Sequence, residues 1–306
     1  MSSADPGRPH PVGTGLVRRL VAGRFPRWAG LPVRRFPSGG TVNAVFRLGG
    51  EMLVRLPLSA GGAEDLVRER EWLPRLAPRL GTPVPEVLGT GDPAEGFPFA
   101  WSVYRWLPGE NPRAGALAEP GRLAEDLAGF VADVRAVDLP GAPPAYRGGP
   151  LASLDAATRA AVSRLRGLPA EGVDCDAVTA VWEDALRAPE WEGPPVWLHA
   201  DLMPGNLLVA GGRLASVIDF GCAGVGDPAC DLFPAWNLLP AGAREVFRRA
   251  VGVDDATWTR GRARTLSQAL IALPHHRGTN PAMADNARHV IRAVLEDVRD
   301  AGGVPA

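Results

Sequence analysis

The first third of the chain consists of short apolar stretches separated by glycines, a pattern typical of β-strands joined by tight turns. We predict three strands over residues 31–36, 42–48 and 51–56. Two further strand candidates follow at 84–88 and 101–106. The first third of the chain therefore predicts a small antiparallel sheet.

Elsewhere, apolar residues recur every three or four positions, which indicates amphipathic helices. A short helix is expected at 16–22 and a longer one at 63–80, where Leu66 and Leu73 share one face. The remaining predicted helices all follow the break at Pro108-Gly109. They are expected at 117–137, 152–168, 177–187, 241–251, 256–273 and 283–301.

The order of these elements predicts an α+β fold with two lobes. A small β-rich N-lobe is expected over residues 16–106, and a larger, mainly helical C-lobe over 107–306. Residues 1–15 are rich in Pro, Gly and Ser and predict a disordered tail.

A second hairpin signal interrupts the predicted helices of the C-lobe. The apolar runs at 206–209 and 214–218 flank Gly211-Gly212, and two glycines between such runs are typical of a two-residue turn. Asn206 starts the first run and Asp219 follows the second. The hairpin therefore predicts that these two side chains lie side by side.

The same stretch contains two spaced motifs. His199, Asp201 and Asn206 follow the order H-x-D-x-x-x-x-N, and Asp219-Phe220-Gly221 begins eighteen residues after Asp201. In a kinase catalytic loop, the Asp accepts the proton of the acceptor hydroxyl, and the Asn and the Asp of D-F-G bind magnesium.

We therefore predict Asp201, Asn206 and Asp219 as catalytic residues, with Asn206 and Asp219 as the Mg²⁺ ligands. An Asp after a strand is often only a turn residue, but the spacing, the hairpin and the D-F-G motif together favour catalysis. His199 is expected to pack behind the loop. Asp227 is expected to cap the segment after D-F-G.

Nucleotide-binding residues are predicted in the N-lobe. The turn after the first strand contains Ser38, Gly39 and Asn43, and its backbone N–H groups would cover phosphates. Arg55 lies in the third strand, where a kinase places a Lys on the α- and β-phosphates. An ordinary surface arginine is the alternative.

The chain contains no lysine, since all 33 Lys+Arg residues are Arg, so Arg55 is read as a replacement that keeps the cation. Glu69 or Glu71 would pair with it. Glu69 is preferred because it lies between Leu66 and Leu73 at helical spacing.

Composition narrows the classes of function. A net charge of -1 argues against nucleic acid as a partner. No apolar run approaches a membrane span, and the N-terminus lacks a signal-peptide core, so neither a membrane partner nor export is expected. We predict a cytoplasmic protein that is a monomer or a homodimer.

The chain resembles the aminoglycoside phosphotransferase family, the antibiotic and small-molecule kinases of the kinase fold. The resemblance is carried, in order, by FPSGGTVNAVFRL, MLVRLP, VREREWLPRL, WSVYRWLPGE, WLHADLMPGNLLV, VIDFGCAGVGDPACDL and DATWTRGRARTL. It implies a protein-kinase-like bilobal fold that uses ATP (or GTP) and Mg²⁺ to phosphorylate a hydroxyl of a small molecule.

The resemblance also implies roles for single residues. It makes Asp201 the base, Arg55 and Glu69 an ion pair, and Tyr104 to Trp106 the adenine-binding hinge. Two positions depart from the family pattern, since Ala200 stands where Gly is usual and Arg55 where Lys is commoner.

The resemblance implies a hydroxylated small molecule as acceptor, expected to be an aminoglycoside-like or other antibiotic. A choline-like amine, a sugar or an amino alcohol is the alternative acceptor. A nucleotide-binding regulator without phosphotransfer is the alternative from another class. A protein kinase is disfavoured, because no A-P-E motif follows Asp219.

Overall fold

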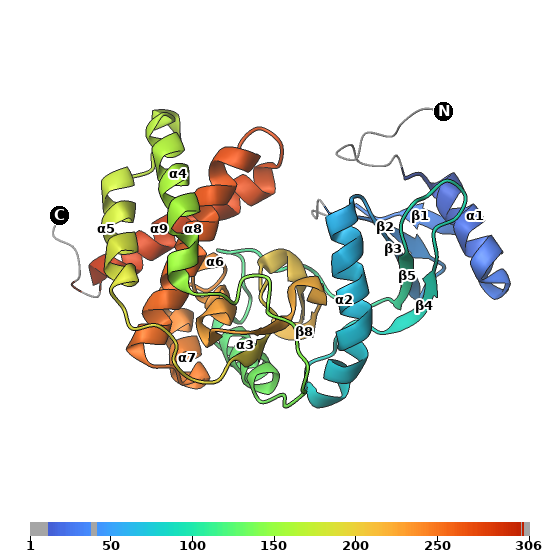
Figure 1. The fold of residues 1–306 in the computed structure, drawn as a ribbon, viewed down its shortest axis with the longest axis horizontal. Helices are drawn as coiled ribbons and strands as arrows, with labels where there is room; N and C mark the ends of the chain where they lie inside the picture. Colours follow the sequence, from blue (N-terminus) through green and yellow to red (C-terminus); the bar gives the residue numbers. More distant parts are fainter. Residues whose placement is uncertain (1–11, 38–41, 301, 303–306) are drawn as a thin grey trace. The chain divides into compact units, whose positions relative to one another are not determined.

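The computed structural model describes residues 12–37, 42–300 and 302. Contacts divide the chain into two compact units (Figure 1). The first unit runs to Gly109 and takes in Ser216–Cys222, and the second holds Glu110–Ala215 and the chain from Ala223. The D-F-G segment thus groups with the N-terminal unit, whereas the predicted lobes assigned it to the C-lobe.

The last residues of the predicted disordered tail at 1–15 are ordered. Residues 1–11 lie outside the described residues, but Val12 is buried and Thr14 already begins helix α1 (Thr14–Arg24). The apolar side chains of Val17, Leu20 and Val21 bury one face of this helix. Disorder was predicted here because the segment is rich in Pro and Gly, and the apolar residues that begin at Val12 are few enough to be overlooked in such a composition.

The first unit contains the predicted antiparallel sheet. Its strands are β1 (Val33–Arg35), β2 (Asn43–Leu48), β3 (Met52–Pro57), β4 (Val87–Gly91) and β5 (Trp101–Arg105), in the order β1-β2-β3-β5-β4. The strand predicted at 84–88 starts later, at Val87. Pro85 has no N–H to give to a ladder, which accounts for the shift.

Alternation along the strands separates the two faces of this sheet. Ala44, Phe46, Val54, Leu56 and Val103 pack with helix α1 in one apolar core. Arg55 and Tyr104 fall on the opposite face, where helix α2 (Ala60–Leu76) lies (Figure 1). The sheet therefore presents apolar residues to one helix and the predicted nucleotide-binding cation to the other.

Helix α2 covers most of the predicted helix at 63–80. It begins three residues earlier because the hydroxyl of Ser59 accepts the N–H of Gly62 at 3.3 Å, which caps the helix. It ends at Leu76, before a 3₁₀ turn that contains Pro78. Leu66, Leu73 and Glu69 are buried on one side.

The second unit is mainly helical, as predicted. Its helices are α3 (Pro120–Arg135), α4 (Asp155–Arg166), α5 (Cys175–Leu186), α6 (Pro234–Asn237), α7 (Ala241–Val251), α8 (Asp255–His276) and α9 (Pro281–Asp300). Helix α8 contacts α4, α5 and α9, which places it at the centre of the packing (Figure 1). Among the described residues, no helix is both long and apolar enough to cross a membrane.

Two small sheets accompany the helices. The predicted hairpin is present as β7 (Leu207–Ala210) and β8 (Arg213–Val217), and Gly211 and Gly212 between them have φ values of +57° and +77°. Both values lie in the left-handed region that a type I′ turn needs. The other sheet, β6 (Val196–Leu198) with β9 (Gly224–Gly226), was not predicted.

Candidate active site

Arg55 lies in β3 and faces helix α2. Its Nη1 lies 3.1 and 3.0 Å from the two carboxylate oxygens of Glu69, and its Nη2 lies 2.6 Å from Oδ1 of Asp219. The ion pair predicted between Arg55 and Glu69 is therefore present, and Glu71 is exposed instead. Arg55 is not a surface arginine, because its side chain is only 11% exposed.

Asn43 completes the contacts of Arg55. With its amide oxygen turned toward the guanidinium, Asn43 accepts from Nε and Nη2, each at 3.0 Å. Each of the three nitrogens of Arg55 then lies within hydrogen-bond distance of a protein acceptor.

The charges around Arg55 stabilise its cation. Burial alone would lower the pKa of Arg55, but the carboxylates of Glu69 and Asp219 raise the pKa well above the ordinary arginine value. Arg55 is thus a fixed positive charge held between two carboxylates.

Glu69 joins four segments of the first unit. Besides Arg55, it accepts the hydroxyl of Tyr104 at 2.5 Å and the N–H of Phe220 at 2.8 Å, and it is fully buried. Burial, together with the charge of Glu69, raises the pKa of Tyr104 well above its ordinary value. The phenol of Tyr104 therefore stays neutral and donates its hydrogen bond to Glu69.

The predicted hinge residues have their side chains engaged in the N-terminal unit. Tyr104 points at Glu69, and Trp106 packs edge-on against Phe36 at 5.2 Å between ring centroids. Arg47 lies over the Trp106 ring at 3.7 Å. Adenine binding by this segment stays a prediction, and Ser38 and Gly39 lie outside the described residues.

The D-F-G segment is tightly fitted against α2. Asp219 has φ +68°, a left-handed conformation that is unusual for a residue with a side chain. A Cβ at Gly221 would lie 2.8 Å from the Cβ of Asp65 in α2, so only glycine fits there. Phe220 is buried.

The predicted catalytic loop, in the second unit, follows β6. The backbone N–H groups of His199 and Ala200 donate to the carboxylate of Asp231 at 2.8 and 2.7 Å. Burial raises the pKa of Asp231 above its ordinary value, against the opposing effect of these hydrogen bonds. Nδ1 of His199 accepts the N–H of Asp201 at 3.2 Å, in the structural role predicted for it.

Asn206 fixes the side chain of Asp201 across the loop. Its Nδ2 donates to Oδ2 of Asp201 at 2.8 Å and to the carbonyl oxygen of Asp201 at 2.9 Å. Ala200, just before Asp201, is fully buried and has φ +64°. The positive φ explains why glycine suits this position, and it marks local strain beside the predicted base.

Two residues of the loop's surroundings were not predicted. Arg147 donates from Nη1 to Oδ1 of Asp201 at 2.6 Å. Asn111 donates from Nδ2 to the carbonyl oxygens of Gly205 and Leu207 at 2.9 and 2.8 Å, which braces the turn before β7. Both lie in loops without periodicity, and their partners are distant in sequence, so no local pattern points to them.

The residues predicted to bind magnesium have suitable chemistry. Because Nδ2 of Asn206 is held by Asp201, its Oδ1 is left as the oxygen that a hard cation would take, and Asp219 offers a carboxylate. In the described ranges, no three His, Cys, Asp or Glu side chains cluster as a metal site. Asn206 belongs to the second unit and Asp219 to the first, so their joint site stays a prediction.

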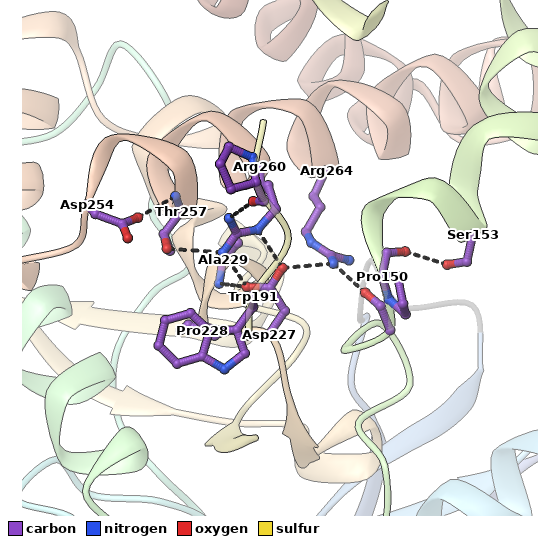
Figure 2. A network of polar contacts seen from close by, with 12 residues as sticks. Pro150, Ser153, Trp191, Asp227, Pro228, Ala229, Asp254, Thr257, Arg260 and Arg264 are labelled. Atoms are coloured by element: carbon purple, nitrogen blue, oxygen red, sulfur yellow. Dashed lines mark hydrogen bonds and ion pairs between the residues drawn. The ribbon is translucent and has the colours of Figure 1, made fainter. Parts of the chain in front are cut away.

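Asp227 has the predicted capping role. Its side chain accepts the N–H of Ala229 at 2.9 Å, and Pro228 is the first residue of the short 3₁₀ helix that follows. Asp227 also binds two buried arginines, Arg260 at 2.9 Å and Arg264 at 3.2 Å (Figure 2).

Comparison with known proteins gives one family and several similar folds. A model described as the phosphotransferase enzyme family matches residues 33–266, more than half of the chain. The GDP and kanamycin complex of APH(2")-IIia has a TM-score of 0.74 at 19% identity, covering 92% of this chain and 98% of its own. No curated protein sequence matches the chain.

Two further solved structures extend this likeness. The gentamicin complex of APH(2")-IIa has a TM-score of 0.62 at 16% identity, covering 93% of this chain and 98% of its own. Macrolide 2'-phosphotransferase MphH from Brachybacterium faecium has a TM-score of 0.59 at 24% identity, covering 91% and 97%. They confirm the predicted protein-kinase-like fold, with a small antiparallel sheet in the N-lobe and a helical C-lobe.

Proposed function

Because the chain belongs to the phosphotransferase enzyme family, we propose that it transfers the γ-phosphoryl group of ATP or GTP to a hydroxyl group of a small molecule. The acceptor we propose is an aminoglycoside-like or other hydroxylated antibiotic, because two of the similar structures are complexes with kanamycin and gentamicin. We also propose that the protein acts in the cytoplasm, where nucleoside triphosphates are found.

The placement of Asp201 carries this proposal. Asp201 follows a strand, and Asp231 holds the backbone N–H groups of the two residues before it. Asn206, five residues on, orients the side chain of Asp201. A carboxylate that is held in place but still partly exposed, at 21%, is able to meet a substrate hydroxyl. A turn residue would need no such support.

In the proposed reaction, the acceptor hydroxyl gives its proton to Asp201. Its oxygen forms a bond to the γ-phosphorus, and the bond from that phosphorus to the β–γ bridging oxygen breaks. The nucleoside diphosphate leaves, and Asp201 later releases the proton to water. Most of the catalytic gain comes from position and charge, because the protein forms no covalent intermediate.

Magnesium bound with the nucleotide would supply positive charge to the phosphate oxygens. We propose that Asn206, through Oδ1, and Asp219, through its carboxylate, hold it. We also propose that Asn43, Arg55, Tyr104 and Trp106 belong to the nucleotide site, as do Ser38 and Gly39.

Glu69 orients Arg55 at this nucleotide site. The pair supplies a cation whose direction is set by a buried carboxylate, as an ammonium–carboxylate pair does in protein kinases. No nucleotide preference follows from these contacts, so both ATP and GTP enter the test.

The proposal is tested by incubating the protein with Mg²⁺, ATP or GTP and a panel of hydroxylated antibiotics, sugars and amino alcohols, followed by mass spectrometry. We expect one acceptor to gain the mass of a phosphoryl group. Asp201→Asn keeps the shape of the side chain but removes the base, so turnover should fall roughly 10²-fold or more.

Nucleotide affinity, measured by calorimetry, is the control in this experiment. It should be unchanged in Asp201→Asn, because Asp201 acts on the acceptor. Near-normal turnover in that variant would refute the base assignment. Nucleotide binding without transfer to any acceptor would favour a regulator instead.

A further inference from the structure

We propose that Arg147 is a positioning residue that holds the carboxylate of Asp201 for proton transfer. This inference rests on the proposed function, which makes Asp201 the base. Nη1 of Arg147 lies 2.6 Å from Oδ1 of Asp201 and 3.3 Å from the carbonyl oxygen of Ala200. The other oxygen, Oδ2, accepts from Asn206 at 2.8 Å. The carboxylate is thus held from both sides, by a cation and by an amide.

Arg147 is presented by a loop whose backbone is fixed to β9. This Arg147 loop comprises residues 143–149. Val225 of β9 exchanges backbone hydrogen bonds with Pro143 and Ala145, each 2.9 Å long, and the N–H of Asp227 donates to the carbonyl oxygen of Gly148 at 3.0 Å. The loop therefore behaves as an extra strand-like edge of the β6–β9 pair.

The loop and β9 approach more closely than side chains allow. A Cβ at Gly226 would lie 2.5 Å from the carbonyl oxygen of Gly148, and a Cβ at Gly224 would lie 2.5 Å from the carbonyl oxygen of Pro143. Both positions of β9 therefore require glycine. A larger residue at either position would push the Arg147 loop away from β9, so the close contact depends on both glycines.

A buried ion network supports the backbone of Arg147 itself. Nη1 of Arg264 donates to the carbonyl oxygen of Arg147 at 2.9 Å, and Nη2 donates to Gly149 and lies 3.2 Å from Oδ2 of Asp227. Arg264 is 2% exposed and Asp227 is 7% exposed. In Figure 2, Arg264 reaches from Asp227 toward the segment beside Pro150.

This support distinguishes the pair from an ordinary surface ion pair. Two exposed side chains gain little from pairing, because each loses conformational freedom to do so. Here the backbone on both sides is already fixed, and Arg147 and Asp201 are only 28% and 21% exposed. The guanidinium therefore sets the direction of the carboxylate. A displacement of about 1 Å at a reacting group costs about 10²-fold in rate.

Arg147→Met and Arg147→Lys test the inference, with Arg288→Met as the matched control. Arg288 is similarly exposed, at 32%, and pairs with Glu171 at 2.7 Å in the same unit. For each variant, kcat, the KM of nucleotide and acceptor, and the denaturation midpoint are measured.

We expect Arg147→Met to lower kcat about 10²-fold while the nucleotide KM and the midpoint stay unchanged. Arg147→Lys should regain about tenfold of this loss, because an ammonium keeps a positive donor near Oδ1 of Asp201 but lacks the rigid planar geometry of the guanidinium. Arg288→Met should leave kcat unchanged.

A wild-type kcat in Arg147→Met, or a Lys variant no better than the Met variant, would overturn the inference and leave the proposed function intact. Failure of the wild-type protein to phosphorylate any acceptor would instead count against the function. A crystal structure of Arg147→Met decides the inference in either case. We expect the Asp201 carboxylate to turn away from Asn206, and an unchanged position would overturn the inference.

Discussion

Arg55 shows how one residue type changes the contacts of a whole site. Its guanidinium spans Glu69, Asp219 and Asn43 at once, whereas a lysine ammonium offers three donors from a single nitrogen. The choice of Glu69 over Glu71 followed from helical spacing alone, because Leu66 and Leu73 define the inward face. The contact with Asp219 was not predicted, since it joins residues 164 positions apart.

Arg55→Met should lower the free energy of unfolding by about 3–5 kcal/mol, because it leaves the buried carboxylate of Glu69 without its cation. Arg55→Lys should lose less, since a cation remains beside Glu69. Chemical denaturation measures both.

Arg105→Met is the control for these variants, because Arg105 pairs with Glu86 in the same unit but is 51% exposed. That pair is expected to contribute less than about 1 kcal/mol. Equal losses in the Lys and Met variants of Arg55 would show that the cation at Glu69 is not what stabilises the site.

The elements differ in how far the sequence predicts them. The β7–β8 hairpin was predicted because two apolar runs and Gly211-Gly212 are a local signal, and both glycines adopt positive φ. The β6–β9 pair was missed because each strand has three residues, and β9 reads Gly-Val-Gly without alternation. Its glycines matter only because the Arg147 loop lies against them, and that contact is not local in sequence.

The 3₁₀ helix after Asp227 depends on a buried charge. Burial alone would raise the pKa of Asp227, but hydrogen bonds from Arg260 and the N–H of Ala229, with the charge of Arg264, lower the pKa below its ordinary value. The carboxylate therefore stabilises the fold above the unfolded-state pKa, about 4, and this contribution is lost as pH falls through the folded-state pKa.

Asp227→Asn should cost about 3–5 kcal/mol near pH 7, because it leaves Arg260 and Arg264 buried without a counterion. The difference from wild type should shrink as the pH falls below about 4, where the unfolded chain takes up a proton, and become small below the lower folded-state pKa, where the native carboxyl is neutral as well. Urea denaturation at a series of pH values measures it, and a pH-independent difference would contradict the assignment.

At the scale of the whole molecule, the order of elements was the most predictable feature. The predicted order was a set of strands with one helix, followed by helices interrupted by a hairpin. This order led to the kinase-like fold, which the similar solved structures share. The assignment of the D-F-G segment to the first unit was not predicted, because chain order places it among the helices and only its contacts with Arg55, Glu69 and Asp65 move it.

Nucleotide binding should stabilise the molecule by mass action. With magnesium and nucleotide at 100 times the dissociation constant, the free energy of unfolding should rise by about 2.7 kcal/mol. Asp219→Ala should lose this increment, because the proposed metal ligand is gone. Asp201→Asn should keep it, because the base acts on the acceptor.

Increments, not absolute midpoints, are the quantity to compare in this experiment. Asp219→Ala also removes the ion pair with Arg55, so its stability without ligand already differs from wild type. Thermal denaturation with and without magnesium separates the two effects, since the ion pair is present without metal. A full ligand increment in Asp219→Ala would mean that the nucleotide binds without this carboxylate, and the metal assignment would then rest on Asn206 alone.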